Sequence, residues 1–434
     1  MSHGGFTLEE LTKIEGHAKL DVEMEGGKVK RTNLEVYEAS RYFESLLLRR
    51  DYREAPSITQ RICGICSVVH TIASIKACED ALSIRPSPQT IDLRRLLLNA
   101  STMHSHTAHL FFFALPDYLG FEDVIELSKK KHELIHLALD LQKLATDVVR
   151  TIGGRALHPV TPSIGGFHSV PDREKIGRMR SDIEEIKKLA EKAARIFSGL
   201  KLPELESSTS GFCLMKAKQY PLYDGLIAGA GVSFKAREYK KHLIERVEPY
   251  SNAKHSRFRG RSYMVGALPR LNASFRNLSG DASSMLRESG FKPPIKNPFV
   301  NNLAQAIELV HFADDSLEIL ERHEKGMKIG KSKIEATPKR RECEGVGVCE
   351  APRGLLFHHY GIGSNGKITY ANVITPTSQN AANMESDIAK FIPSISHKPE
   401  SEIRLLLEML IRAYDPCFSC SAHFLELNTK RKKR

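Results

Sequence analysis

The chain of 434 residues has only eight cysteines and no long apolar segment. Eight cysteines are too few for a disulfide scaffold in a chain of this length, so a reducing cytoplasm is the expected location. The longest apolar run, residues 110–115, is far shorter than the ~18 residues that a membrane-spanning helix needs. The first ten residues lack a basic stretch followed by an apolar one, so we expect neither a signal peptide nor a membrane span.

The net charge of +12 comes from three basic segments, 235–261, 325–341 and 430–434. Basic patches can bind nucleic acid, but no helix-turn-helix pattern, aromatic platform or zinc-finger spacing accompanies these. We therefore expect no nucleic-acid partner, and we interpret the first two segments as solvated or partner-facing loops.

Helical periodicity dominates the chain. Apolar and polar residues alternate around the turns at residues 25–27 and 363–366, which predicts β-hairpins over 17–37 and 354–375. No internal repeat and no low-complexity linker is present, so the pattern favours one mainly α domain with a core of long helices and small peripheral β-sheets. Long helices are predicted over residues 92–115, 122–152, 172–200, 298–324 and 400–413.

Two C-x-x-C pairs lie near opposite ends of the chain, Cys63 with Cys66 and Cys417 with Cys420. Such spacing places both sulfurs on one side of a turn or helix start. Four thiolates brought together make one soft metal site, and a site that joins both ends implies a closed fold. By spacing alone, a structural zinc tetrathiolate explains the pairs as well as a catalytic metal does.

The residues around the cysteines resemble the two signature motifs of the nickel-iron hydrogenase large subunit. They read R-I-C-G-I-C-S-V-V-H (61–70) and D-P-C-F-S-C-S-A-H (415–423), and further family motifs follow in the right order over residues 6–423. The short chain and R-A-Y-D-P-C (412–417) are most similar to the soluble archaeal branch, which includes sulfhydrogenases and viologen-reducing enzymes. The remaining motifs are K-I-E-G-H (13–17), R-Y-F-E (41–44), H-S-H-T-A-H-L (104–110) with P-D (116–117), E-A-P-R-G (350–354) and I-T-P-T (374–377).

This resemblance implies the large-subunit fold and a Ni-Fe(CN)2(CO) centre. Cys63 and Cys417 would be terminal nickel ligands, and Cys66 and Cys420 would bridge nickel and iron. The iron would also carry cyanide and carbon monoxide, which no residue supplies. His70 would donate a hydrogen bond to a bridging sulfur.

The implied reaction is the heterolytic cleavage of dihydrogen, which releases a proton that needs a base. By resemblance, Glu15 adjoins Cys417 and carries that proton. Arg353 would lie over the open metal position, oriented by Asp117 and Asp415. Its fixed charge and five donors would polarise a bound ligand.

The resemblance also implies two further groups of residues. Thr375, Pro376 and Thr377 would enclose and hydrogen-bond the diatomic ligands. Glu44 and His423 would bind a second metal ion, to which Val373 adds its backbone carbonyl. The ion would be magnesium, although the histidine ligand leaves iron open.

Once four cysteines are assigned, the motifs leave no cysteine set for an iron–sulfur cluster. Electrons must therefore pass to a separate iron–sulfur small subunit and to further electron-transfer subunits. In the resembling family a maturation protease cuts after the motif histidine, so residues 424–434 are predicted to be a removable propeptide. The alternatives are a relative of the quinone-site subunit of respiratory complex one, which lacks the four cysteines, and a structural zinc protein.

Overall fold

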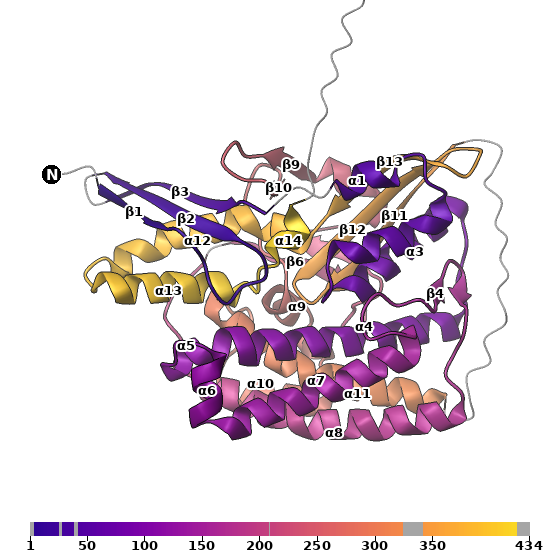
Figure 1. The fold of residues 1–434 in the computed structure, drawn as a ribbon, viewed down its shortest axis with the longest axis horizontal. Coiled ribbons are helices and arrows are strands. Elements are labelled where there is room, and N and C mark those ends of the chain that lie inside the picture. Colours follow the sequence, from indigo (N-terminus) through magenta and orange to yellow (C-terminus); the bar gives the residue numbers. More distant parts are fainter. Residues whose placement is uncertain (1–3, 26–27, 39–41, 208, 324–341, 423–434) are drawn as a thin grey trace, which may run out of the picture.

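The computed structural model describes residues 4–25, 28–38, 42–207, 209–323 and 342–422, and it confirms a mainly helical fold with small sheets (Figure 1). Its long helices are α3 (Ser67–Leu82), α4 (Pro88–Ala108), α7 (His132–Gly153), α8 (Arg173–Ser198), α11 (Asn301–Arg322), α12 (Pro376–Ile395) and α13 (Glu400–Ala413). The short ones are α1 (Phe43–Leu47), α2 (Ala55–Thr59), α5 (Leu115–Leu119), α6 (Val124–Lys130), α9 (Ala267–Ser274), α10 (Gly280–Glu288) and α14 (Phe418–Ser421). A π-helical stretch, η3 (His109–Ala114), joins α4 to α5, and 3-10 turns are η1 (Tyr52–Glu54), η2 (Gln60–Ile62), η4 (Ala236–Lys241), η5 (Phe275–Asn277) and η6 (Pro298–Val300). Among the described residues, none of the helices combines the length and the apolar character that crossing a membrane requires.

The strands form small antiparallel sheets. The predicted hairpins are present as β2–β3 and β12–β13. The sheets are β1 (Gly4–Leu8), β2 (Ala18–Glu25) and β3 (Lys28–Val36); β4 (Pro162–Ser163) and β5 (Gly166–Phe167); β6 (Phe212–Met215), β7 (Leu226–Gly229) and β8 (Val232–Phe234); β9 (Leu243–Val247) and β10 (Lys254–Phe258); and β11 (Cys343–Ala351), β12 (Gly354–Ile362) and β13 (Ile368–Ile374).

Helices α4, α7, α8 and α11 pack against one another in the lower layer of Figure 1. The predicted starts and stops hold for α8, whose N-cap Asp172 accepts a hydrogen bond from the Lys175 amide, and for α7, which ends before Gly154 at φ +76°. The helix predicted over residues 122–152 is instead broken at Lys131 into α6 and α7.

The sheet β11–β13 is not peripheral, because every residue of β12 is buried and α3 lies directly on β11. A side-chain carbon on Gly347 would approach the Ala73 carbonyl oxygen to 2.0 Å, and one on Gly345 would approach that of Ala77 to 2.2 Å. Glycine therefore allows the helix backbone to rest on the strand. This packing holds the start of α3 against the β11–β12 turn that contains Arg353.

The N-terminal segment around Glu15 meets the segment after α13 at α14, which lies between the sheets in the centre of Figure 1. The Phe418 amide donates to the Glu15 carbonyl oxygen at 2.9 Å, and Glu15 and Cys417 form a parallel β-bridge. One buried apolar cluster contains residues from Leu8 to Phe418. The segment after α13 is thus anchored to the N-terminal segment at the second cysteine pair.

Candidate metal centre

The first cysteine pair lies at the start of α3. Cys63 follows η2 in an extended conformation, and Cys66 is the N-cap residue of α3. The Cys66 amide donates to Cys63 Sγ at 3.3 Å. Both sulfurs are therefore on one side of a helix N-terminus, where the helix dipole favours thiolates.

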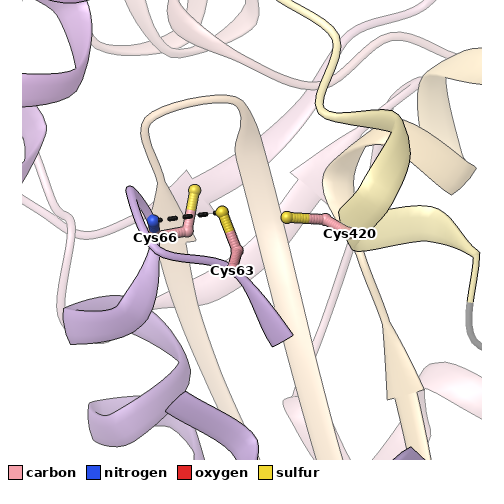
Figure 2. Close-up of side chains that lie close together, drawn as sticks. All are labelled: Cys63, Cys66 and Cys420. Carbon is pink, nitrogen blue, oxygen red and sulfur yellow. Dashed lines mark hydrogen bonds between the residues drawn. The ribbon is translucent and has the colours of Figure 1, made fainter. Parts of the chain in front are cut away.

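The second pair brackets the start of α14. Cys417 is its N-cap residue, and the Cys417 amide donates to Thr377 Oγ1 at 3.0 Å. Cys63 Sγ lies 3.6 Å from Cys417 Sγ, and the sulfurs of Cys63, Cys66 and Cys420 all lie within 4.8 Å of one another. Figure 2 shows these last three pointing toward one another from the two ends of the chain.

All four cysteines are at most 4% exposed and none is in a disulfide. Hydrogen bonds from Cys417, Cys420 and Cys66 hold the pKa of Cys63 well below its usual value. Burial raises the pKa of Cys417 and Cys420. The donor set fits a soft cation, because a cation would release the thiol protons and satisfy four buried sulfurs together.

Glu15 lies against the second pair. Its Oε2 is 3.0 Å from Cys417 Sγ and accepts a hydrogen bond from the Ser419 amide at 3.2 Å, while the Ser419 hydroxyl donates to its other oxygen. A carboxylate in direct contact with a buried thiol can accept its proton.

Arg353 lies on the other side of the cluster and is 3% exposed. Its Nη1 donates to Cys66 Sγ and to Ser105 Oγ, both at 3.3 Å. Nη2 pairs with Asp415 Oδ1 at 2.8 Å, and Nε donates to the Asp415 carbonyl oxygen at 2.7 Å. Burial opposes its charge, yet Asp415 and the cysteines keep the pKa of Arg353 well above its ordinary value.

The structure pairs Asp117, which the resemblance assigned to the orientation of Arg353, with other cations. The Asp117 carboxylate pairs with Arg412 Nη1 at 2.6 Å and with the Lys13 ammonium. Arg412 is 2% exposed and also binds Glu408, so Asp117 helps to neutralise a second buried arginine. The motif indicates a buried aspartate but not which arginine it pairs with.

The ring of His70 contacts His358, a histidine that none of the motifs includes. Its Nδ1 lies 3.0 Å from Nε2 of His358, whose Nδ1 lies 2.5 Å from the Tyr360 hydroxyl. Tyr360 in turn donates to Ser74 Oγ at 3.0 Å. The alternation of His358 and Tyr360 along β12 places both on one face of the strand, but a single sequence does not show that α3 covers this face.

The segment predicted to enclose diatomic ligands forms the start of α12. Pro376 is its first residue and Thr375 its N-cap residue. Thr377 Oγ1 accepts the Cys417 amide, as described above. Thr375 Oγ1 is buried without a hydrogen-bond partner in the described protein, which leaves a polar atom available to a bound group.

The predicted second metal site is only partly within the described residues, because His423 lies outside them. Glu44 Oε1 accepts a hydrogen bond from the Val373 amide at 2.8 Å, so these two predicted ligands are adjacent. The contact involves the amide of Val373 and not its predicted ligand atom, the carbonyl oxygen. Lys254 Nζ lies 3.4 Å from Glu44 and 3.5 Å from Glu245. Burial raises the pKa of Glu44, and Lys254 opposes this effect.

The other four cysteines are scattered. Each thiol faces a different backbone carbonyl: Cys78 that of Tyr52, Cys213 that of Pro269, Cys343 that of Ile362 and Cys349 that of Tyr223. Within the described segments, metal-binding side chains gather in threes only at the site of Figure 2. The structure therefore gives no support to a metal site at Cys343 and Cys349, although they lie only six residues apart.

Comparison with known proteins confirms the resemblance predicted from the motifs. The family model for nickel-dependent hydrogenase matches residues 41–136 and 215–423. The chain therefore belongs to the nickel-dependent hydrogenase family, whose members are oxidoreductases.

Two relatives come from Pyrococcus furiosus. The chain is 35% identical to sulfhydrogenase 2 subunit alpha over 422 residues. The aligned region covers 97% of this chain and 99% of that subunit. It is 31% identical to sulfhydrogenase 1 subunit alpha over 426 residues, and the aligned region covers 97% of this chain and 98% of that subunit. A solved NAD+-reducing [NiFe]-hydrogenase in the H2-reduced state matches 98% of this chain and 100% of its own, with a TM-score of 0.87 and 26% identity.

Proposed function

We propose that the chain is the catalytic large subunit of a nickel-iron hydrogenase, which converts dihydrogen reversibly into two protons and two electrons. One observation carries the proposal: the buried four-cysteine cluster has a carboxylate, Glu15, on one thiol and a guanidinium, Arg353, on another. A structural zinc tetrathiolate requires neither a proton acceptor nor a buried cation beside it. Heterolytic cleavage requires both a base and a source of positive charge.

A nickel–iron centre held here would supply a soft, redox-active Lewis acid that polarises dihydrogen. We assign Cys63 and Cys417 as terminal nickel ligands and Cys66 and Cys420 as ligands shared with iron, which would also carry cyanide and carbon monoxide. The close approach of the four sulfurs supports this assignment. The orphaned hydroxyl of Thr375 supports the presence of a polar group beside α12.

The Cys417 thiolate accepts a proton and passes it to Glu15, its direct neighbour. Beyond Glu15 the groups become progressively more exposed. Gly16, which follows Glu15, lies between Ser419 and Glu38. A side-chain carbon at Gly16 would be 2.8 Å from the Ser419 amide nitrogen and 3.3 Å from Glu38 Oε1. Glu38 is therefore close to the Glu15–Ser419 pair. Glu38 Oε1 is 3.9 Å from Nε2 of the exposed His17. This arrangement supports proton exit along the N-terminal segment.

Arg353 acts as a fixed positive charge at the cluster, because Asp415 holds it through two of its nitrogens. His70 is assigned the role of hydrogen-bond donor to a bridging sulfur. Its Nδ1 lies 3.0 Å from Nε2 of His358, a contact that holds the orientation of the ring. Both roles stabilise negative charge on the cysteines.

We assign the second metal site to Glu44, the Val373 carbonyl and His423, with magnesium as the ion and iron as the alternative. Glu44 and Glu245 share one lysine, Lys254, so the described part of this site has a net negative charge. Such a surplus favours a divalent cation.

Electrons leave to an iron–sulfur small subunit, and from there to further subunits. The support is that the four remaining cysteines face four separate backbone carbonyls, so this chain offers no second thiolate cluster. The relatives carry names of alpha subunits, which is consistent with a multi-subunit enzyme.

We also propose that a maturation protease cuts after His423 and removes residues 424–434, leaving a domain of residues 1–423. Five consecutive cations end this segment, and burying them beside a metal site would be very costly. The intact mass of the active, nickel-loaded subunit tests the proposal: a mass ending at His423 supports it, and active enzyme that retains Arg434 refutes it.

Metal analysis after anaerobic purification tests the main proposal. Equal amounts of nickel and iron are expected, whereas zinc alone would establish the structural alternative. Replacing Cys63 or Cys420 by serine should abolish nickel retention or hydrogen turnover. Cys213→Ser is the matched control, because Cys213 is equally buried but faces Pro269, and it should retain nickel.

A further inference from the structure

A buried chain of hydrogen bonds leads from His109, at the start of η3, through Gln305 and Asp415 to Arg353. Nδ1 of His109 lies 2.6 Å from Oε1 of Gln305 on α11, and Gln305 Nε2 donates to Asp415 Oδ2 at 2.9 Å. The other oxygen of Asp415 binds Arg353. His109, Gln305 and Asp415 are each at most 2% exposed, so water does not compete for these contacts.

The donors and acceptors of this chain determine where its hydrogens lie. His109 Nε2 is 2.7 Å from the carbonyl oxygen of Arg412, which can only accept, so Nε2 carries a hydrogen. Gln305 must turn its amide nitrogen toward the Asp415 carboxylate, because the opposite orientation would bring two oxygens together. Its oxygen then faces His109 Nδ1, which must donate as well. Both nitrogens of His109 are therefore donors.

The neighbouring contact between the same helices shows what is special about Gln305. One turn away, His106 Nε2 lies 2.7 Å from Oε2 of Glu308, a carboxylate that also binds Arg270. A carboxylate at position 305 would accept from His109 equally well, but it would repel Asp415. Glutamine, unlike glutamate, can both accept from the histidine and donate to the aspartate.

The backbone supports the same conclusion. The helix changes from α- to π-helical hydrogen bonding at His109, the first residue of η3. Such wide turns are rare and are found mostly at functional sites. His109 thus lies at the start of such an irregularity.

We infer that His109, donating from both ring nitrogens as an imidazolium, and Gln305 position Asp415, and through it hold Arg353 against Cys66. The inference rests on the proposed role of Arg353. His109 and Gln305 are positioning residues, since neither contacts a cysteine in the hydrogen bonds given above. The buried imidazolium also offsets negative charge on the four thiolates.

A double-mutant cycle in the complete, metal-loaded enzyme tests the positioning. Gln305→Glu keeps the size and the acceptor for His109 but loses the donor to Asp415, and turnover should fall on the order of 10- to 100-fold with nickel content unchanged. In the Arg353→Lys background the same change should have almost no further effect. Equal fold-losses in both backgrounds would overturn the inference.

Asn302→Asp is the matched control. It makes the same amide-to-acid change one turn away on α11, and Asn302 is 1% exposed but donates to Tyr118. Its effect should be equal in both backgrounds. If Gln305→Glu does not retain nickel, Gln305→Met, which removes the donor without adding a charge, takes its place in the cycle.

Two further outcomes separate this inference from the proposed function. If Arg353→Lys alone is fully active, the proposed role of Arg353 fails. If Arg353→Lys is slow while Gln305→Glu is normal, only the positioning inference fails. Independently, 15N NMR of histidine-labelled enzyme, with His109→Gln for assignment, should show hydrogens on both ring nitrogens of His109, and a neutral ring would overturn the imidazolium.

Discussion

Replacing Glu15 by glutamine should stop proton transfer and leave the metal site intact. Glutamine has the same shape as glutamate: its amide oxygen can still accept from the Ser419 amide, and its amide nitrogen can donate to the Ser419 hydroxyl oxygen. The buried contact between the N-terminal segment and Cys417 also persists, because it depends on the backbone of residue 15. The variant therefore removes a titratable group and little else.

The size of the effect follows from the geometry. Glu15 Oε2 is 3.0 Å from Cys417 Sγ, within direct proton-transfer distance. Positioned general acid–base groups contribute about 10²- to 10⁴-fold to rate, or roughly 3–5 kcal/mol. The next carboxylate outward, Glu38, is placed beside the residue after Glu15 and not beside the thiol. We therefore expect a loss in the upper part of this range.

The assay compares two reactions of the nickel-loaded enzyme. Dye-linked hydrogen uptake needs protons and electrons to leave, whereas deuterium–proton exchange needs only protons to leave. Both should collapse in Glu15→Gln, with normal nickel and iron content. Glu15→Asp, which keeps a carboxyl group, should retain part of the activity. Glu35→Gln, at a half-buried glutamate of β3 that pairs with Lys19, should leave the activity unchanged. Exchange at the native rate in Glu15→Gln would refute the proton route.

Three further predictions test other parts of the structure. Arg353→Lys loses the planar guanidinium that binds Asp415 and Cys66. Turnover should therefore fall on the order of 100-fold, about 2.7 kcal/mol in activation free energy, with little change in metal content. An unchanged rate would make Arg353 purely structural. Gly347→Ala would drive a carbon into the Ala73 carbonyl and should lower the free energy of unfolding by about 1–3 kcal/mol, whereas Gly177→Ala, in open space on α8, should not destabilise. Burial raises the pKa of Glu385 from 4.5 to about 7. The folded protein therefore holds this proton more tightly than the unfolded chain does, and the free energy of unfolding falls as the pH rises from 4.5 to about 7. Between pH 5 and pH 8 the free energy of unfolding should therefore fall less in Glu385→Gln than in the native protein, by about 3 kcal/mol at most. An identical pH dependence in the variant would contradict the raised pKa of Glu385.

The sequence predicts the helices with clear amphipathic patterns best. The predicted range 400–413 coincides with α13, and the predicted range 172–200 begins at Asp172, the N-cap residue of α8. The break at Lys131 was missed because the apolar spacing continues from α6 into α7. Helix α3 and strand β11 were not predicted, since α3 is buried on nearly all sides and so has little periodicity, and β11 owes its glycines to the helix that lies on it.

The candidate site shows the same division between local and long-range information. Motifs indicate which side chains gather at the cysteines, because ligand spacing is local, and the structure brings Glu15 and Arg353 to them as the resemblance implies. Partner choice among buried charges is not local. Asp117 pairs with Arg412, whereas Arg353 pairs with Asp415. Each buried guanidinium thus has its own carboxylate, which offsets its charge. A prediction of which aspartate serves which arginine needs the three-dimensional arrangement of α5, α13 and the β11–β12 turn, and that arrangement depends on packing between segments hundreds of residues apart.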